Sequence, residues 1–121
     1  MTIAAYALAG LIAAGIIYVG AAYLFAPART AAGFGVPSPP AANPFYAVKG
    51  VRDIASGLIT LALMVFGGPH LLGVGLLALA VIPIGDMVIV LRSGGTRKAA
   101  LGIHGATAAV MIVIAAVLLS A

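Results

Sequence analysis

The chain has 121 residues, of which 64% are hydrophobic and only 7% are charged, and its mean hydropathy is +1.29. These values lie far outside the range of soluble domains and indicate an integral membrane protein. The absence of cysteine excludes disulfides and thiolate metal sites, and the scattered positions of the basic residues argue against a nucleic-acid-binding surface despite the net charge of +4.

Four apolar stretches are long enough to cross the roughly 30 Å of bilayer hydrocarbon as helices. In chain order they are residues 3–25, 45–66, 70–91 and 98–120. The first ends before Pro27 because proline disfavours helix in the residue that precedes it. The stretches predict an all-α fold in which residues 1–121 form a single domain, an antiparallel four-helix transmembrane bundle packed through alanine and glycine.

The connections between these helices differ in charge. The proline-rich segment 28–43 is predicted to be a connection without a spanning element, and the second connection is a tight turn. All basic residues lie in or beside the first and third connections: Arg29, Lys49, Arg52, Arg92, Arg97 and Lys98. The positive-inside rule therefore places these two connections in the cytoplasm and both termini on the other face of the inner (plasma) membrane.

The ionisable residues inside the predicted helices lie at a common depth. With a rise of 1.5 Å per residue, Asp53, Asp86 and His104 lie roughly 9 to 13 Å inside the cytoplasmic ends of three different helices. Tyr18 reaches the same level from the first helix. A carboxylate facing lipid costs on the order of 3 kcal/mol, so the two acids are expected to face the interior of the bundle.

Helical periodicity places the polar residues of the second helix on one face, and Thr107 on the same face as His104. The face of the second helix comprises Tyr46, Lys49, Asp53, Ser56, Gly57 and Thr60, with Arg52 at its edge. We predict that Asp53, Asp86 and His104 are catalytic, as general acid, general base and proton relay. The predicted substrate-binding residues are Tyr18, Tyr46, Lys49, Arg52 and Thr107.

Two interpretations of these residues stay open. In the structural one, Asp53 pairs with Lys49 or Arg52, and Asp86 pairs with Arg92 or a neighbouring arginine, so that the ion pairs only hold helices together. In the functional one, the same groups form a site. No metal-ligand spacing, phosphate-binding loop, nucleophile elbow or haem motif is present, so neither a metal nor another cofactor is predicted.

Three classes of function fit this pattern. The favoured one is a membrane-embedded enzyme that isomerises, cyclises or opens an epoxide in a lipophilic isoprenoid or lipid-like substrate. The second is a proton-coupled or small-solute transporter that acts as a homo-oligomer, and the third is an accessory subunit of a larger membrane complex. Polar groups at a single depth favour the enzyme over the transporter. Membrane lipid and a lipophilic small molecule are the expected partners, and nucleic acid is not.

Three segments, KGVRDIASGL, IPIGDMVIVLRSGG and GIHGATAAVMIV, resemble a family of small bacterial four-helix membrane proteins known only as a domain of unknown function. The chain is more loosely similar to DoxX-like membrane proteins. The resemblance covers nearly the whole chain, implies the same four-helix architecture and names no reaction. The positions that carry it are Lys49, Arg52, Asp53, Gly57, Pro83, Gly85, Asp86, Arg92 and His104.

Overall fold

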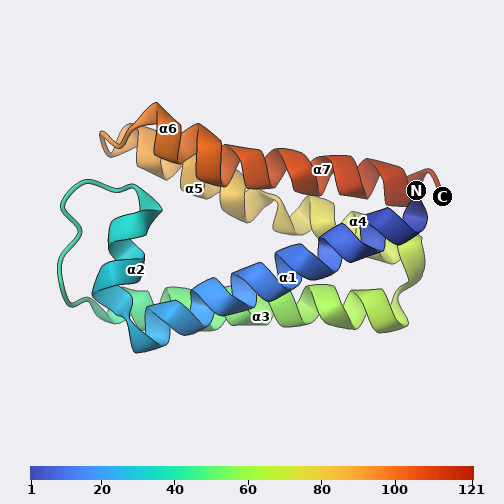
Figure 1. Ribbon diagram of the computed structural model, residues 1–121, viewed down its shortest axis with the longest axis horizontal. Coiled ribbons are helices and arrows are strands. Elements are labelled where there is room, and N and C mark those ends of the chain that lie inside the picture. The colour runs from blue at the N-terminus through green and yellow to red at the C-terminus, as the bar shows by residue number, and fades with distance from the viewer.

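The computed structural model describes residues 1–121 and contains helices but no strands (Figure 1). Three helices precede residue 67: α1 (Thr2–Phe25), α2 (Pro27–Phe34) and α3 (Pro44–Phe66). The next long helix consists of α4 (Gly68–Leu79) and α5 (Val81–Arg92). The last consists of α6 (Arg97–Ala99), the π-helix η1 (Ala100–Gly105) and α7 (Ala106–Leu119). Both termini lie at one end of the molecule, and α2 lies at the other (Figure 1).

Three of the long helices are apolar enough and long enough to cross a membrane: Thr2–Phe25, Gly68–Arg92 and Arg97–Leu119. The chain is therefore an all-helical protein of membrane type, as the sequence predicts. Helix α3 is 23 residues long but carries Lys49, Arg52 and Asp53, which lower its apolar character. The predicted four-helix transmembrane bundle is thus confirmed only in part.

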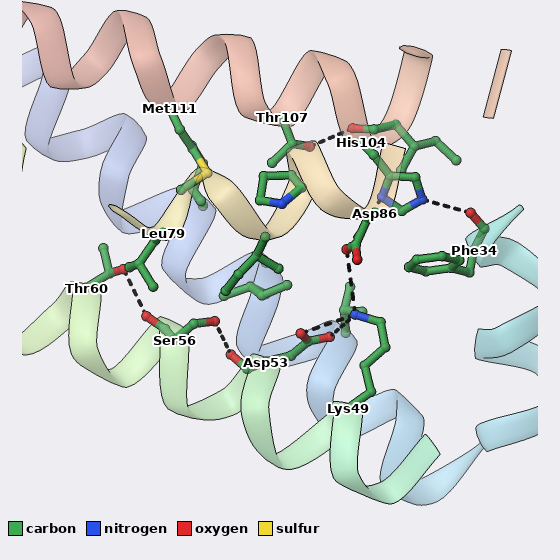
Figure 2. A pocket seen from close by; sticks show the side chains of 17 residues that line it. Phe34, Lys49, Asp53, Ser56, Thr60, Leu79, Asp86, His104, Thr107 and Met111 are labelled. Carbon is green, nitrogen blue, oxygen red and sulfur yellow. Dashed lines mark hydrogen bonds and ion pairs between the residues drawn. The ribbon is translucent and has the colours of Figure 1, made fainter. Parts of the chain in front are cut away.

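Helix α2 lies mostly within segment 28–43, which the sequence predicts to be a connection without a spanning element, and it is a short helix that this prediction does not describe. Pro27 occupies the first turn, where its missing N–H costs nothing, and Gly35 ends the helix in the left-handed conformation with φ of 110°. Proline at the start and glycine just past the end are the usual boundaries of a helix. The helix carries Phe34 to the end of the molecule where the predicted site lies (Figure 2).

Helices α1 and α3 pack in close contact because glycines face each other across their interface. A Cβ atom on Gly50 would lie 2.7 Å from the carbonyl oxygen of Gly20, and one on Gly57 would lie 2.8 Å from that of Ala13. Real side chains do not tolerate such distances. Small residues therefore let these two backbones approach, as is usual between helices in membranes.

The third long helix is interrupted at Ala80, between α4 and α5. Pro83 explains the break, because a proline ring clashes with the backbone carbonyl four residues earlier, here that of Leu79. Beyond the break, α5 packs against η1, whereas α4 packs against α7 and α3.

The hydrophobic core lies at the end of the molecule that holds both termini. It consists of Ala5, Ala9, Leu72, Leu76, Ala80, Met111, Ile114, Ala115 and Leu118, from α1, α4, the break at Ala80 and α7. Toward the other end, the pair α1 and α3 is separated from α5 and η1, and α2 with its following loop lies there (Figure 1). The fold thus packs one end tightly and leaves room between the helix pairs at the other.

Candidate functional site

A cavity of about 340 Å³ lies between the helix pairs, and we call it the chamber (Figure 2). Its apolar lining includes Ile12, Ile16, Leu79, Ile82 and Met111. Its ionisable lining residues are Lys49, Asp53, Asp86 and His104, which we call the polar cluster. The structure thus places all three residues that the sequence predicts to be catalytic around one cavity.

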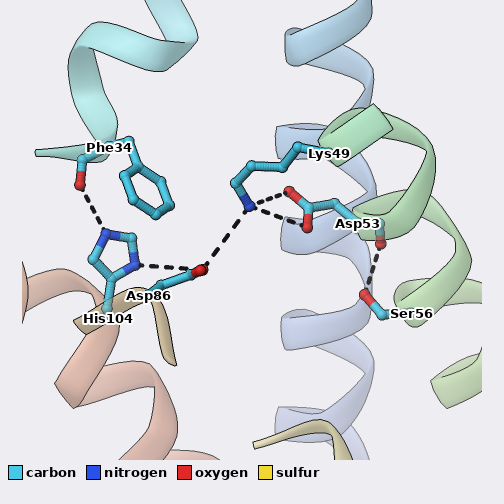
Figure 3. Close-up of polar contacts among 6 residues, drawn as sticks. All are labelled: Phe34, Lys49, Asp53, Ser56, Asp86 and His104. Atoms are coloured by element: carbon cyan, nitrogen blue, oxygen red, sulfur yellow. Dashed lines mark hydrogen bonds and ion pairs between the residues drawn. The ribbon is translucent and has the colours of Figure 1, made fainter. Parts of the chain in front are cut away.

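The Lys49 ammonium holds the centre of the polar cluster (Figure 3). Its Nζ atom donates to both carboxylate oxygens of Asp53, at 3.0 and 3.3 Å, one helical turn along α3. The same Nζ lies 3.9 Å from Oδ2 of Asp86 on α5. Asp53 is only 3% exposed, so this ion pair neutralises a carboxylate that would otherwise be buried as an uncompensated charge.

Two aromatic rings flank the same ammonium. Its Nζ lies 5.2 Å from the ring centroid of Tyr23 on α1 and 5.2 Å from that of Phe34 on α2. Both distances fall within the range of cation–π attraction. Lys49 therefore connects four helices, because it contacts Asp53 on its own helix, Asp86 on α5, and one ring from each of α1 and α2.

The π-helix η1 carries His104, which is 8% exposed. Its Nε2 lies 2.8 Å from the backbone carbonyl oxygen of Phe34, and its Nδ1 lies 4.0 Å from Oδ2 of Asp86. A carbonyl oxygen can only accept a hydrogen bond, so Nε2 carries a proton and Nδ1 is the nitrogen that faces Asp86. Single π-helical turns of this kind are frequent at functional sites.

The hydroxyl groups that line the chamber are bonded to their own helices. Ser56 donates to the carbonyl of Asp53 at 2.9 Å, Thr60 to that of Ser56 at 2.9 Å, and Thr107 to that of Ile103 at 2.7 Å. Hydroxyl groups bonded in this way offer little to a ligand. Beyond the polar cluster, the chamber therefore presents an essentially apolar wall.

A second cavity of about 540 Å³ lies between α3, α5 and the loop that follows α2, and we call it the vestibule. It shares Phe34, Lys49, Asp53, Ile82 and Asp86 with the chamber. The Lys49 ion pairs therefore lie at the boundary that the two cavities share. The vestibule is additionally lined by Tyr23, Tyr46, Asn43 and Arg52.

The predicted substrate-binding residues do not all reach the same place. Lys49 lines both cavities, Thr107 lines the chamber, and Tyr46 and Arg52 line the vestibule. Tyr18 is 75% exposed and lines neither cavity. It lies five positions before the buried Tyr23, which corresponds to roughly 140° around the helix, so α1 turns Tyr18 away from the other site residues.

The ion pairs also differ in part from those of the structural interpretation. Asp53 pairs with Lys49, which was one of its two expected partners. Asp86 lies beside Lys49 and His104 rather than Arg92, which is exposed and makes no ion pair. Arg92 is the last residue of α5, six positions beyond Asp86, which amounts to roughly 9 Å along the helix.

The sequence of residues 13–118 matches the family described as "Domain of unknown function (DUF4267)". The chain belongs to the DUF4267 family. This confirms the resemblance to a family of unknown function, and the matched range includes the whole polar cluster. No curated protein and no solved structure matches the chain with significant similarity. The family description assigns no activity, so the chemistry of this DUF4267 protein has to be argued from its own site.

Sequence reasoning missed two residues of this DUF4267 site, Phe34 and Tyr23. Phe34 escaped notice because its helix was expected to be a connection, although Pro27 and Gly35 mark the two ends of that helix. Tyr23 does not stand out in the sequence, because an aromatic residue near the end of a spanning helix is usual at the membrane interface. Its spacing on α1 is a signal that could have found it, because Ala13, Gly20 and Tyr23 follow helical offsets of seven and three, which Tyr18 does not share.

The contacts within the polar cluster of this DUF4267 protein decide which of its groups can react with a ligand. Two carboxylates, one ammonium and one imidazole lie together, and Lys49 is already paired, so the cluster offers no free anion-binding ammonium. Asp86 is the less tightly held carboxylate, because its neighbours lie at 3.9 and 4.0 Å. Asp86 and the Nδ1 atom of His104 are the groups placed to exchange protons with a ligand in the chamber.

Proposed function

We propose that this protein is a membrane-embedded enzyme whose polar cluster performs acid–base chemistry on a lipophilic, isoprenoid or lipid-like substrate. The observation that carries the proposal is the chamber, in which an apolar wall leads to Asp86, His104, Lys49 and Asp53. Ligand sites typically combine a mostly apolar lining with a few placed polar groups. A purely structural clasp needs the ion pairs but not the cavity beside them.

The roles within the proposed site follow from the contacts. His104 presents Nδ1 as the proton acceptor, because the carbonyl of Phe34 occupies Nε2. Asp86 lies 4.0 Å from that nitrogen and can pass or receive the proton. Asp53 and Lys49 form the fixed ion pair that holds charge beside them. An isomerisation fits this set, because a proton taken from one substrate atom and returned to another leaves the balance of atoms and electrons unchanged.

We further propose that α3 spans the inner membrane with the three apolar helices, so that the single domain 1–121 is an antiparallel four-helix transmembrane bundle. The close packing of α3 on α1 through Gly50 and Gly57 supports this placement. The end that carries α2 would then face the cytoplasm, because all six basic residues lie on elements at that end. Both termini would lie on the opposite face.

A transport function is less well supported by the packing. A route across the molecule would have to continue from Thr60 past Gly75 toward the termini. The chamber lining reaches Thr60 and Met111, and beyond them the core of α1, α4 and α7 contains Leu72, Leu76 and Leu118, which are fully buried. The buried polar side chains of the protein, Asp53, Ser56, Thr60 and His104, all line the chamber, and none lies among these leucines.

The proposal is tested by lipid profiles of membranes that contain wild type or Asp86→Asn. We expect a lipophilic metabolite to change in abundance with wild type but not with the variant, at equal amounts of folded protein. Lys98→Gln serves as the matched control, because it also removes a charge at the same end from a residue that lines neither cavity. A folded Asp86→Asn protein that gives the same lipid profile as wild type would contradict the proposal.

A further inference from the structure

The vestibule lining contains two donor side chains, Arg52 and Tyr23, that take part in no hydrogen bond or ion pair within the protein. Asn43 accepts a hydrogen bond from the backbone of Phe45 at 2.9 Å, and the Tyr46 hydroxyl donates to the carbonyl of Pro40 at 2.7 Å. The Lys49 ammonium is bound by Asp53. Arg52 and the Tyr23 hydroxyl, by contrast, make no hydrogen bond or ion pair.

The position of Tyr23 makes its free hydroxyl informative. The residue is only 3% exposed, yet no buried side-chain oxygen in the protein lacks a partner, so the hydroxyl oxygen reaches accessible space. Of the two cavities, Tyr23 lines only the vestibule. A buried tyrosine normally pairs its hydroxyl, because an unmade hydrogen bond is costly. The phenol therefore offers a donor to a ligand in the vestibule.

The charged residues at this end of the molecule indicate the charge of that ligand. All six basic residues lie at the end of the molecule that carries α2, where they outnumber the two acidic side chains, and the vestibule lining itself holds Lys49 and Arg52 beside both acids. Asp53 and Asp86 are both held beside Lys49. Arg52 is thus the only cation of either cavity lining without an ion pair. A planar guanidinium is well suited to bind a carboxylate or a phosphate.

The chamber supplies the complementary site for hydrocarbon. Lys49 and Thr60 both line it and are 11 positions apart on α3, so it extends about 16 Å along that helix. An extended dodecyl chain has a comparable length. The two cavities adjoin at Lys49, Asp53 and Asp86, so a molecule that spans both would place its head in the vestibule and its chain in the chamber.

We propose that the two cavities together bind a single-chain amphiphile with an anionic head group, a carboxylate or a phosphate, which Arg52 and the Tyr23 hydroxyl recognise in the vestibule. This inference rests on the proposed function, because it names the class of its substrate. The part of the chain nearest the head then lies beside Lys49, Asp86 and His104. Arg52 and Tyr23 select the substrate, and the polar cluster acts on it.

The test measures equilibrium binding of three radiolabelled probes to the full chain in phosphatidylcholine nanodiscs. The probes are dodecanoate, dodecyl phosphate and the uncharged methyl dodecanoate. We expect Arg52→Gln to weaken binding of at least one anionic probe about tenfold and to change binding of the ester by less than about twofold. Whichever anion loses more affinity identifies the head group, and Tyr23→Phe should weaken the same probe several-fold while keeping its ring.

Arg29→Gln is the matched control, because it removes the same charge from an exposed residue at the same end that lines neither cavity. The inference is overturned if Arg52→Gln and Arg29→Gln have equal effects on both anionic probes, or if wild type binds neither anion more tightly than the ester.

A chamber-filling variant separates this inference from the proposed function. Gly15 lines the chamber, and a Cβ atom built on it meets nothing within 4 Å, so Gly15→Leu fills the cavity without a clash at its Cβ. Loss of ester binding in Gly15→Leu, together with no anion preference in wild type, would leave the proposed function standing and this inference wrong. Ester binding that is unchanged in Gly15→Leu would contradict both.

Discussion

His104 and Phe34 are 70 positions apart in the sequence, yet Nε2 of the imidazole lies 2.8 Å from the backbone carbonyl oxygen of Phe34. The two rings also pack at a centroid distance of 4.5 Å. The hydrogen bond fixes which nitrogen faces the chamber, because only Nε2 can donate to that carbonyl while Nδ1 faces Asp86 (Figure 3). Helix α2 therefore orients the imidazole as well as covering the end of the chamber.

This contact predicts that the neutral imidazole of His104 is the Nε2–H tautomer. Nitrogen chemical shifts of ¹⁵N-histidine-labelled protein in detergent measure the tautomer directly. The chain has only two histidines, so the variant His70→Gln assigns both signals. His70 is exposed and makes no side-chain hydrogen bond, and it should show the averaged shifts of a free imidazole. A protonated Nδ1 in neutral His104 would contradict the assignment.

Gly35→Ala tests whether the turn after α2 holds this hydrogen bond. Gly35 has φ of 110°, and a Cβ atom there would lie 2.9 Å from Cβ of Ala99, so alanine strains the turn in two ways. We expect the His104 nitrogen shifts to move toward those of a free imidazole. Gly33→Ala is the control, because a Cβ there meets nothing within 4 Å, and it should leave the shifts unchanged.

The two acids should differ in their effect on stability. Asp53→Asn removes a carboxylate that binds Lys49 at 3.0 Å and is 3% exposed, so we expect a loss of about 1 to 3 kcal/mol in unfolding free energy. Asp86→Asn loses only neighbours at 3.9 and 4.0 Å and should cost less than about 1 kcal/mol. Unfolding of both variants in the same detergent checks the order. Equal losses would mean that Asp86 is as much a structural clasp as Asp53.

The local sequence pattern predicted which residues of each helix belong to the site. It did not predict the contacts between residues that are far apart in the sequence. The periodicity of α3 places Asp53, Ser56, Gly57 and Thr60 on one face, and all four are buried. The common depth of Asp53, Asp86 and His104 follows from counting residues along helices that begin or end at clear signals. These features depend only on helix geometry and on the cost of placing charge in lipid.

The remaining features depend on how helices rotate and approach one another. Nothing in the local pattern of Phe34 shows that its carbonyl meets His104 across 70 positions. The π-helix at Ala100–Gly105 shifts the register of its helix, and a regular 3.6-residue period does not reveal it. Only the packed structure shows that Lys49 reaches both Asp53 and Asp86.

Gly57→Ala should destabilise the interface between α1 and α3. The new methyl group would meet the side chains of Ile17 and Ile16 and would lie 2.8 Å from the carbonyl oxygen of Ala13. Backbone cannot move aside as a flexible side chain can, so we expect a loss of about 1 to 3 kcal/mol and a lower midpoint of thermal unfolding. Gly85→Ala has open space around its Cβ and should leave the midpoint unchanged or raise it slightly. The same small effect in both variants would refute the close packing.

Cysteine labelling tests the proposed orientation, and the absence of native cysteine removes any background. His70 and Ser93 are exposed residues near opposite ends of the helix Gly68–Arg92. If the end that carries α2 is cytoplasmic, a membrane-impermeant maleimide should label His70→Cys in intact cells and Ser93→Cys only in inside-out vesicles. The reverse pattern would invert the topology and place the vestibule outside the cytoplasm. Labelling of both positions from the same side would show that α4 and α5 do not cross the membrane, and the proposed four-helix transmembrane bundle would then be wrong.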